Sequence, residues 1–504
     1  MNTCFFRLTF CAIALFCGTC LATTRYVDLN STNPAPPYGS WSTASTNIQN
    51  AIDAAVAGDQ ILVTNGVYKT GGRAVVGTMT NRVGVYKPVA VRSVNGPAMT
   101  TIEGYPAPYN PNGARCVYLA ANAVLSGFTL TKGATQGDFD GPEISFGAAV
   151  WCESISATVS NCVIVGNTGF AATAYSGSLV DCLIASNAMY VAGGTYASVL
   201  NRCTLRGNTA GTYGGGAMES TLKRCLLVGN SAGLAGGGVE GGGLNDCIVT
   251  GNHAQIGGGI YAADATNCTV TGNAADNSGG GAFWGTNYNC ILFFNTCTNE
   301  FESDSAWSEL NFCCTSQVTN GVGNFTNVPL FVNAANGDFG LQTNSPCINA
   351  GNNVYASEAT DFDGNPRIAG GTVDVGAYEF QSPSSILPYA WAQQYGLPLD
   401  GSMDNIDTDG DGVNNWQESR ARTNPNDSLS LLKIVSITES VPGPVINWQS
   451  VNSVSYYVQR GQNLTPASFS TVQSNIIGSL TGMSSYTDTN AAGSGPYFYR
   501  IGVQ

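Results

Sequence analysis

The sequence contains little charge, and basic residues are especially scarce. Only 10% of its 504 residues are charged, and it has 19 basic residues, one histidine and 33 acidic residues, for a net charge of −14. Nucleic acids and anionic lipid surfaces attract proteins through basic patches. The composition therefore argues against nucleic acid as a partner and against attachment to an acidic membrane surface.

Long hydrophobic runs are also missing, although a spanning helix needs about 20 apolar residues. A shorter apolar run over residues 8–18 follows Arg7 and precedes Cys20-Leu21-Ala22, a plausible cleavage site, which is the arrangement of a secretory signal. We therefore expect a signal peptide over residues 1–22 and no transmembrane helix. The mature protein is expected to be secreted or held at the cell surface or outer membrane. A lipid anchor on Cys20 remains an alternative.

Glycine and cysteine are abundant, and both recur with a fixed period. Seven of the 17 cysteines follow one another at intervals of 20, 21, 22, 22, 21 and 22 residues: Cys162, Cys182, Cys203, Cys225, Cys247, Cys268 and Cys290. Each is followed by an aliphatic residue two positions later and by asparagine five positions later, from Asn167 to Asn295. Eleven residues before each of the last five stands Gly-Gly-Gly or Ala-Gly-Gly. A fixed period with fixed internal offsets is typical of a solenoid.

Alternation within the repeat indicates strands. Each cysteine and the aliphatic residue two positions later share a face that never carries a charge, whereas the position between them varies. Such a pattern separates an inward face from an outward face. Repeats of 20 to 22 residues built from short strands predict the coils of a parallel β-helix. Coils stack about 4.8 Å apart, so each position becomes a column of like residues.

The columns give specific structural expectations. The cysteine column is expected to hold buried free thiols, with disulfides between adjacent coils as the alternative. The asparagines are expected to bond one another between coils and to occupy a left-handed turn. Cysteines outside the column are the better disulfide candidates: Cys297, Cys313, Cys314 and Cys347.

The solenoid can be followed toward the N-terminus. Phe128 takes the cysteine position one coil before Cys162, with 34 residues between the two positions, so this coil carries an insertion. Further back, an apolar helical stripe follows Ser45 and predicts a capping helix over residues 43–57. This helix is expected to cover the open N-terminal end of the hydrophobic column, since solenoids need caps.

Three stretches of residues 25–380 resemble known exported β-helix proteins. Residues 47–68 look like the N-terminal cap of pectin-lyase-like proteins, and the Gly-rich repeats resemble right-handed β-helices, including polymorphic outer-membrane adhesins. Residues 345–351, 361–367 and 373–379 are similar to the choice-of-anchor Q domain, which implies a closing segment over 335–380. The resemblance implies an all-β right-handed parallel β-helix over residues 23–380. It does not imply a particular activity.

A calcium loop follows the solenoid, within a connecting segment over residues 381–430 that begins with a helical run. The sequence from Asp407 to Glu418 matches the EF-hand loop pattern. The expected oxygen ligands are Asp407, Asp409, Asp411, the Val413 carbonyl, Asn415 and Glu418. The loop resembles dockerin and thrombospondin type 3 repeats, and calcium is the expected cofactor. An acidic Asp-Gly linker is the alternative.

The last part of the chain, residues 431–504, alternates apolar and polar residues in strand-like segments. Three such segments, 445–448, 456–460 and 497–501, are rich in aromatic and β-branched residues. This pattern predicts a small β-sandwich, weakly similar to fibronectin type III.

The repeats contain a second outward column that is mainly aromatic. Its expected ligand-binding members are Trp151, Tyr175, Tyr196, Tyr261 and Phe283, with Met218 and Glu240 between them. A column of exposed rings could contact sugars, or it could stack on itself and stabilise the sheet. The sequence is compatible with either interpretation.

Catalytic residues are harder to find. Glycoside hydrolysis needs two carboxylates at a set separation. The weak candidates are Asp138, Asp140 and Glu143 in the inserted loop, together with Glu153. The sequence thus favours an adhesin-like scaffold, expected to be a monomer, that contacts extracellular or cell-wall polysaccharide. A polysaccharide lyase or glycoside hydrolase is the alternative.

Overall fold

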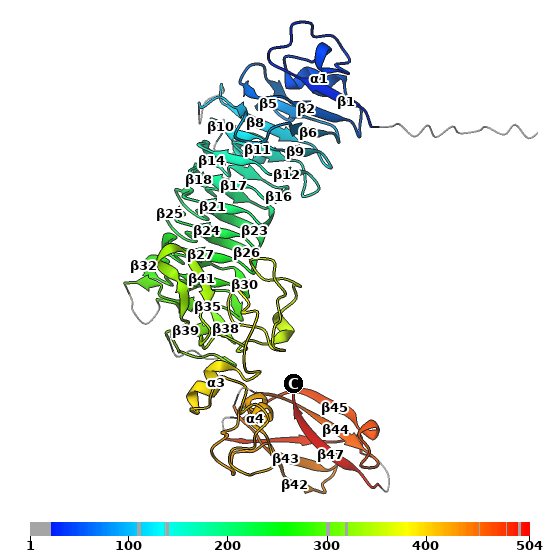
Figure 1. Cartoon of the computed structure of the whole chain (residues 1–504), viewed down its shortest axis with the longest axis vertical. Coiled ribbons are helices and arrows are strands. Elements are labelled where there is room, and N and C mark those ends of the chain that lie inside the picture. Colours follow the sequence, from blue (N-terminus) through cyan, green and yellow to red (C-terminus); the bar gives the residue numbers. More distant parts are fainter. Residues whose placement is uncertain are drawn as a thin grey trace, which may run out of the picture.

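The protein is a long parallel β-helix with a small β-domain at its C-terminal end (Figure 1). The computed structural model describes residues 22–107, 112–135, 137, 141–298, 303–317, 321–452, 454–479, 481–491 and 495–504. The expected signal peptide therefore lies outside the described residues, except for Ala22. Within the described residues, no helix is long and apolar enough to cross a bilayer.

Three sheets run along the solenoid. Sheet 1 has 21 strands: β1 (Thr24–Val27), β2 (Gln60–Val63), β4 (Arg73–Ala74), β5 (Thr80–Val85), β6 (Ala90–Ser93), β8 (Ala114–Leu119), β9 (Val124–Ser126), β11 (Val150–Cys152), β12 (Thr158–Ser160), β15 (Ala174–Tyr175), β16 (Ser178–Val180), β19 (Thr195–Tyr196), β20 (Val199–Asn201), β23 (Ala217–Lys223), β26 (Val239–Asn245), β29 (Ile260–Tyr261), β30 (Asp264–Thr266), β33 (Ala282–Phe283), β34 (Thr286–Tyr288), β37 (Ser305–Ala306) and β38 (Glu309–Asn311). All its pairings are parallel except that of β4 with β5.

Sheets 2 and 3 are narrower. Sheet 2 has 11 strands: β3 (Gly66–Tyr68), β7 (Thr100–Glu103), β10 (Thr129–Thr131), β13 (Val163–Val165), β17 (Leu183–Ala185), β21 (Thr204–Arg206), β24 (Leu226–Val228), β27 (Ile248–Thr250), β31 (Thr269–Thr271), β35 (Ile291–Phe293) and β39 (Cys314–Thr315). Sheet 3 has seven strands: β14 (Thr168–Ala171), β18 (Ala188–Val191), β22 (Thr209–Ala210), β25 (Ser231–Ala232), β28 (His253–Ile256), β32 (Ala274–Ser278) and β36 (Thr296–Cys297). The predicted parallel β-helix is confirmed.

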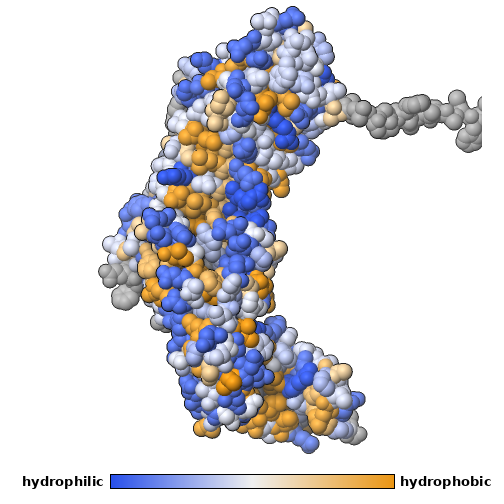
Figure 2. Space-filling view, in the orientation of Figure 1, coloured by the Kyte–Doolittle hydropathy of each residue, from blue (hydrophilic) through white to orange (hydrophobic). Residues whose placement is uncertain are grey.

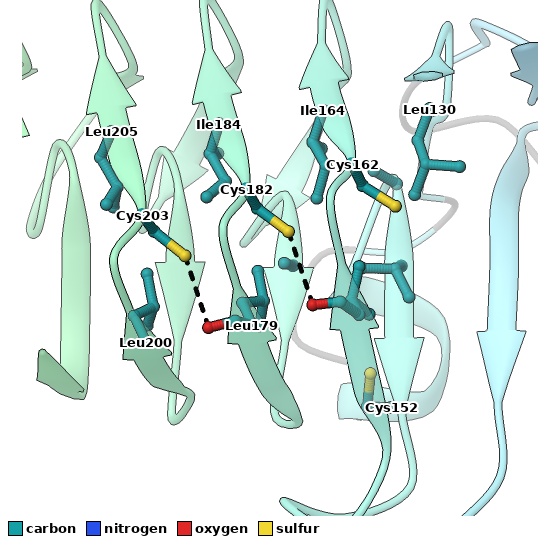
Figure 3. Close-up of a cluster of buried hydrophobic side chains, with 14 of the residues drawn as sticks. Leu130, Cys152, Cys162, Ile164, Leu179, Cys182, Ile184, Leu200, Cys203 and Leu205 are labelled. Atoms are coloured by element: carbon teal, nitrogen blue, oxygen red, sulfur yellow. Dashed lines mark hydrogen bonds between the residues drawn. The ribbon is translucent and has the colours of Figure 1, made fainter. Parts of the chain in front are cut away.

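The cysteine column lies in the core, as expected. Each of its thiols is free and buried between sheets 1 and 2. Figure 3 shows the column beside the aliphatic column that contains Ile164 and Ile184, with the Cys203 thiol donating to the carbonyl of Leu179 at 3.4 Å. Phe128 precedes β10, which pairs with β13 in register, so its place in this column is confirmed.

The expectation of disulfides outside the column is wrong. Cys313, Cys314 and Cys347 are free and buried, and no disulfide joins Cys297 to another described cysteine. Cys313 is in fact the next member of the cysteine column, because β35 and β39 pair Ile291 with Cys314. A 23-residue interval between Cys290 and Cys313 hid this register from the sequence pattern.

The asparagine column forms a continuous hydrogen-bonded ladder. From Asn167 to Asn273, each side-chain amide donates to the amide oxygen of the next coil at 2.9 to 3.0 Å. Asn295 ends the series by donating to Asp304 at 3.0 Å. The left-handed backbone lies one residue earlier than expected, for example at Gly207 (φ 60°) and Ser186 (φ 53°). Asparagine therefore suits this position because its side-chain amide forms these hydrogen bonds, and not because it tolerates a left-handed backbone.

The N-terminal helix is shorter than expected but serves the expected purpose. Helix α1 (Ile48–Ala54) buries Ile48, Ala51 and Ile52 in the main core. Its N-cap is Asn47, whose side chain accepts a hydrogen bond from Gln49 at 2.7 Å. Ser45 instead bonds the backbone of Asn47, so its proposed capping role is corrected.

The segment over residues 335–380 packs against the side of the solenoid. It follows β40 (Phe331–Asn333) and includes β41 (Asp338–Leu341). Its buried residues, such as Ile348 and Ala377, pack with Ile248 and Ile291 from the outer face of sheet 2. The segment expected to close the solenoid thus covers part of its lateral face.

Asp246 lies fully buried beneath this segment. Its carboxylate is 3.6 Å from the guanidinium of Arg367, which is also buried. Burial raises the pKa of Asp246 to about 7, although the charge of Arg367 acts in the opposite direction. The folded protein therefore holds a proton that an unfolded aspartic acid, with a pKa of about 3.9, would release at lower pH.

This linkage predicts a pH dependence of stability. Because the native state binds the Asp246 proton more tightly, the free energy of unfolding should fall as pH rises from about 4 to about 7. Asp246→Asn should make the fall shallower by up to a few kcal/mol, at about 1.4 kcal/mol per pKa unit. Urea denaturation at pH 5 and pH 8 measures the difference. Asp264→Asn changes an exposed carboxyl of the next coil and is the control; equal pH dependence in both variants would contradict the prediction.

The C-terminal part contains two helices and a small β-domain. Helices α3 (Tyr389–Gln394) and α4 (Asn415–Ala421) flank the acidic loop; α4, with its Asn414 and Gln417 capping box, is an element that the sequence analysis missed. Two three-stranded antiparallel sheets then form the β-domain, with β42 (Ile434–Thr438), β43 (Val445–Gln449) and β46 (Met483–Thr487) in one and β44 (Ser455–Gly461), β45 (Ser470–Ile477) and β47 (Phe498–Val503) in the other. Trp448 and Tyr456 are buried in its core.

Candidate functional site

The aromatic column of sheet 1 is a real structural column. Strand pairing places its members side by side in consecutive coils: Tyr118, Trp151, Tyr175, Tyr196, Met218, Glu240, Tyr261 and Phe283. The five predicted residues are therefore brought together by the fold. Tyr118 is an additional member that was missed because the inserted loop interrupts the repeat before it reaches β11.

The rings stack on one another along the solenoid axis. Tyr118 and Trp151 lie 5.2 Å apart between ring centroids, and the interval from Tyr175 to Tyr196 is 5.9 Å. Phe146, which ends helix α2 (Pro142–Ser145), stacks against both Tyr175 and Tyr196 at 5.2 and 5.4 Å. Ring faces within this stack are therefore shared with neighbouring rings, and ring edges are what remains for a ligand.

Met218 and Glu240 divide the column into two stacks. On the far side, Tyr261 stacks on Phe283 at 5.8 Å. Two coils separate Tyr196 from Tyr261, so at about 4.8 Å for each coil the ring stacking is interrupted where Met218 and Glu240 stand. We call this interval, bounded by Tyr196 and Tyr261, the column gap.

The column gap contains a carboxylate in an unusual environment. Glu240 is half-buried, and its Oε2 atom has no hydrogen-bond partner among the described residues. Burial raises the pKa of Glu240, and the charge of Glu219 adds to this. Burial also raises the pKa of Tyr196 to about 12, with a hydrogen bond to Glu219 acting in the same direction. From the sequence, Glu240 was predicted only to stand between the aromatic members of the column, and Glu219 was not singled out.

Two of the four predicted acidic catalytic candidates belong to the described residues, and these two lie in different segments of the chain. Asp138 and Asp140 lie outside the described residues. Glu143 lies in α2, where its backbone carbonyl accepts a hydrogen bond from Arg115. Glu153 follows β11 at the surface, and its carboxylate accepts a hydrogen bond from the backbone of Ala121 at 2.9 Å.

The acidic loop brings three carboxylates close together. Oxygen atoms of Asp407, Asp409 and Asp411 lie within 4.8 Å of one another and could hold a metal ion. The loop is folded around Asp407, which accepts hydrogen bonds from the backbone of Gly410 and Gly412 at 2.7 and 2.8 Å. These bonds set the tight turn that brings the carboxylates together.

The remaining oxygen atoms fit a cation. Glu418 is fully buried in α4, and its Oε2 has no hydrogen-bond partner among the described residues; the same holds for one oxygen each of Asp409 and Asp411. Burial, together with the charges of the three aspartates, raises the pKa of Glu418 to about 7. Buried carboxylate oxygens without donors are costly unless a cation compensates them.

Two other predicted ligands differ in their placement. Asn415 is buried at the start of α4, where its amide oxygen accepts a hydrogen bond from Thr408 and its nitrogen donates to Met403, both at 2.8 Å. It therefore braces the loop in this structure. Val413 donates its backbone N–H to Asp411 at 2.8 Å, which leaves its carbonyl as the predicted ligand atom.

Solved structures with a similar shape include three lyases. A pectate lyase (Pel9A) has a TM-score of 0.46 at 13% identity, covering 71% of this chain and 96% of its own. A rhamnogalacturonan lyase has 0.37 at 11%, covering 59% and 90%. An alginate lyase from Paenibacillus sp. str. FPU-7 has 0.30 at 14%, covering 52% and 94%. The sequence matches no family model and no curated protein.

Proposed function

We propose that this protein is an exported, cell-surface or secreted scaffold of adhesin-like function that contacts polysaccharide through the column on sheet 1. The observation that carries the proposal is the register of its aromatic residues over consecutive coils. Aromatic rings exclude water from the apolar faces of sugars, and coil spacing near 4.8 Å is close to the repeat of a sugar chain. Hydrophobic residues also gather in patches along the solenoid (Figure 2).

The column gap is the part of the column best suited to a sugar ring. Within each stack the rings cover one another, whereas Tyr196 and Tyr261 border the gap from its two sides. The free Oε2 of Glu240 can accept a hydrogen bond from a sugar hydroxyl there. A few weak contacts of this kind give modest affinity, which suits multivalent adhesion.

Removing the two tyrosines at the gap should therefore abolish binding. We expect Tyr196→Ala combined with Tyr261→Ala to lose retention in polysaccharide affinity gels, because each ring contributes roughly 0.5 to 1.5 kcal/mol beyond its buried area. Tyr190→Ala removes an exposed ring from sheet 3 and should leave retention unchanged. If the double variant melts far below the wild type and still binds its glycans, the rings only stabilise the sheet.

Glu240 supports a second candidate function, glycoside hydrolysis. Two carboxylates with different environments, here Glu219 and Glu240, are the usual machinery for that reaction, and a raised pKa suits the acid. Under this alternative, the wild type should release reducing sugar from a polysaccharide in the panel and Glu240→Gln should not. Release of 235 nm-absorbing unsaturated products would instead indicate a lyase.

We further propose that the loop from Asp407 to Glu418 binds calcium. Oxygen-only ligands from carboxylates and a backbone carbonyl are those that calcium prefers. The unpartnered oxygens of Asp409, Asp411 and Glu418 support this assignment.

A further inference from the structure

The structure contains a cleft of about 600 Å³ between the end of the solenoid and the β-domain. Its walls come from the last coil near Phe312, the segment around Tyr355, helices α3 and α4, and strands of the β-domain. Clefts of this size between domains are common ligand sites. The residues that line this cleft are different from those of the column on sheet 1.

The charges of the cleft differ from those of the whole protein. Among the side chains of its described lining residues, only those of Arg420 and Arg422 are charged, and neither an aspartate nor a glutamate is present. This is notable in a chain with 33 acidic and 19 basic residues. No ion pair joins either arginine to a carboxylate within the described part of the chain.

Arg422 is held in place without an anionic partner. Its guanidinium lies 5.3 Å from the ring centroid of Phe312. Gly323 leaves the necessary space, because a side chain there would collide with the guanidinium. Burial lowers the pKa of Arg422 to about 10, and the charge of Arg420 acts in the same direction. Two neighbouring cations are therefore left to be compensated by something other than a side chain.

The rest of the lining offers polar and aromatic groups typical of a sugar site. Asn349 is fully buried, and its Oδ1 atom has no hydrogen-bond partner among the described residues. The indole Nε1 of Trp391 is likewise buried without an acceptor. Both residues line the cleft, and the rings of Trp391 and Tyr355 can cover the carbon face of a sugar.

We propose that the interdomain cleft binds a carboxylate-bearing sugar, that is, a short uronate oligosaccharide. The guanidinium groups match a carboxylate through paired hydrogen bonds. The exposed side chains of Gln394 and Asn475, which also line the cleft, can then bond the hydroxyl groups. This site does not depend on the column of sheet 1, so either can exist without the other.

Titration of the mature protein with trigalacturonate tests the inference. Binding is monitored by calorimetry and by the change in the fluorescence of Trp391 relative to that of the other tryptophans. We expect saturable binding to one site. Arg420→Gln, which changes an exposed side chain, should weaken it roughly tenfold or more, and Arg422→Gln should weaken it at least as much. Arg206→Gln removes the same charge from an exposed position of sheet 2 and should leave the affinity unchanged.

A second ligand distinguishes the contribution of the carboxylate to binding from that of the sugar ring. Neutral galactotriose should bind at least roughly tenfold more weakly than trigalacturonate. The proposal is overturned if the two ligands bind equally, if trigalacturonate shows no saturable binding, or if Arg420→Gln binds like the wild type while retaining its thermal midpoint. Because Arg420 is exposed, loss of folding does not complicate this variant. The variant with Tyr196→Ala and Tyr261→Ala should still bind trigalacturonate, which distinguishes the cleft from the column.

Discussion

Calcium should raise the thermal midpoint of the C-terminal part of this protein, and Glu418→Gln should remove most of that effect. Glu418 is buried with an unpartnered oxygen beside three aspartates, so the apo loop concentrates like charges in a region of low dielectric. A cation converts this repulsion into attraction. A ligand at 100 times its dissociation constant stabilises the folded state by about 2.7 kcal/mol.

Calorimetry and thermal melts with and without calcium measure this effect. Glu439→Gln removes an exposed carboxyl from the nearby β-domain and should bind calcium like the wild type. Equal calcium uptake by Glu418→Gln and Glu439→Gln would contradict the assignment, as would a wild type that binds no calcium at all.

The asparagine ladder should be the most sensitive part of the solenoid to a single substitution. Asn230 donates hydrogen bonds to the Leu205 carbonyl and to Asn252, both at 2.9 Å. It also accepts from the backbone and the side chain of Asn208, both at 3.0 Å. Asn230→Ala leaves these buried groups unpaired, and the two abandoned donors alone should cost roughly 2 to 6 kcal/mol.

Thermal unfolding followed by circular dichroism tests this expectation. Asn201→Ala is a matched control in the neighbouring coil, because the Oδ1 of Asn201 already has no hydrogen-bond partner among the described residues. We expect a large fall in the midpoint for Asn230→Ala and little change for Asn201→Ala. Similar midpoints for the two variants would show that the ladder contributes little stability.

Much of the solenoid could be predicted because its repeats carry the same residues at the same offsets. The interval from Cys162 to Cys290 determines the register, and the alternation around it determines which side chains face inward. Once the coil length is known, the residues of each column can be predicted from the sequence alone. The acidic loop was likewise predictable, since its carboxylates lie within 12 consecutive residues.

The remaining features depend on contacts that no local pattern encodes. The burial of Asp246 could not be predicted, because it comes from Arg367 and its neighbours, far along the chain. The position of Cys313 was hidden by an irregular interval, and Tyr118 by an insertion. The paired arginines of the cleft were not noticed because Phe312 and Gly323 approach Arg422 only in the folded chain.

Binding of the mature wild-type protein to a polysaccharide panel, with product analysis of the same samples, tests the central proposal most directly. The expected result is retention by at least one extracellular or cell-wall polysaccharide, with no release of reducing sugar or of 235 nm-absorbing products. Failure to bind any member of the panel would contradict a glycan-contacting scaffold. Degradation of the bound polymer, lost in Glu240→Gln, would show that the column belongs to an enzyme.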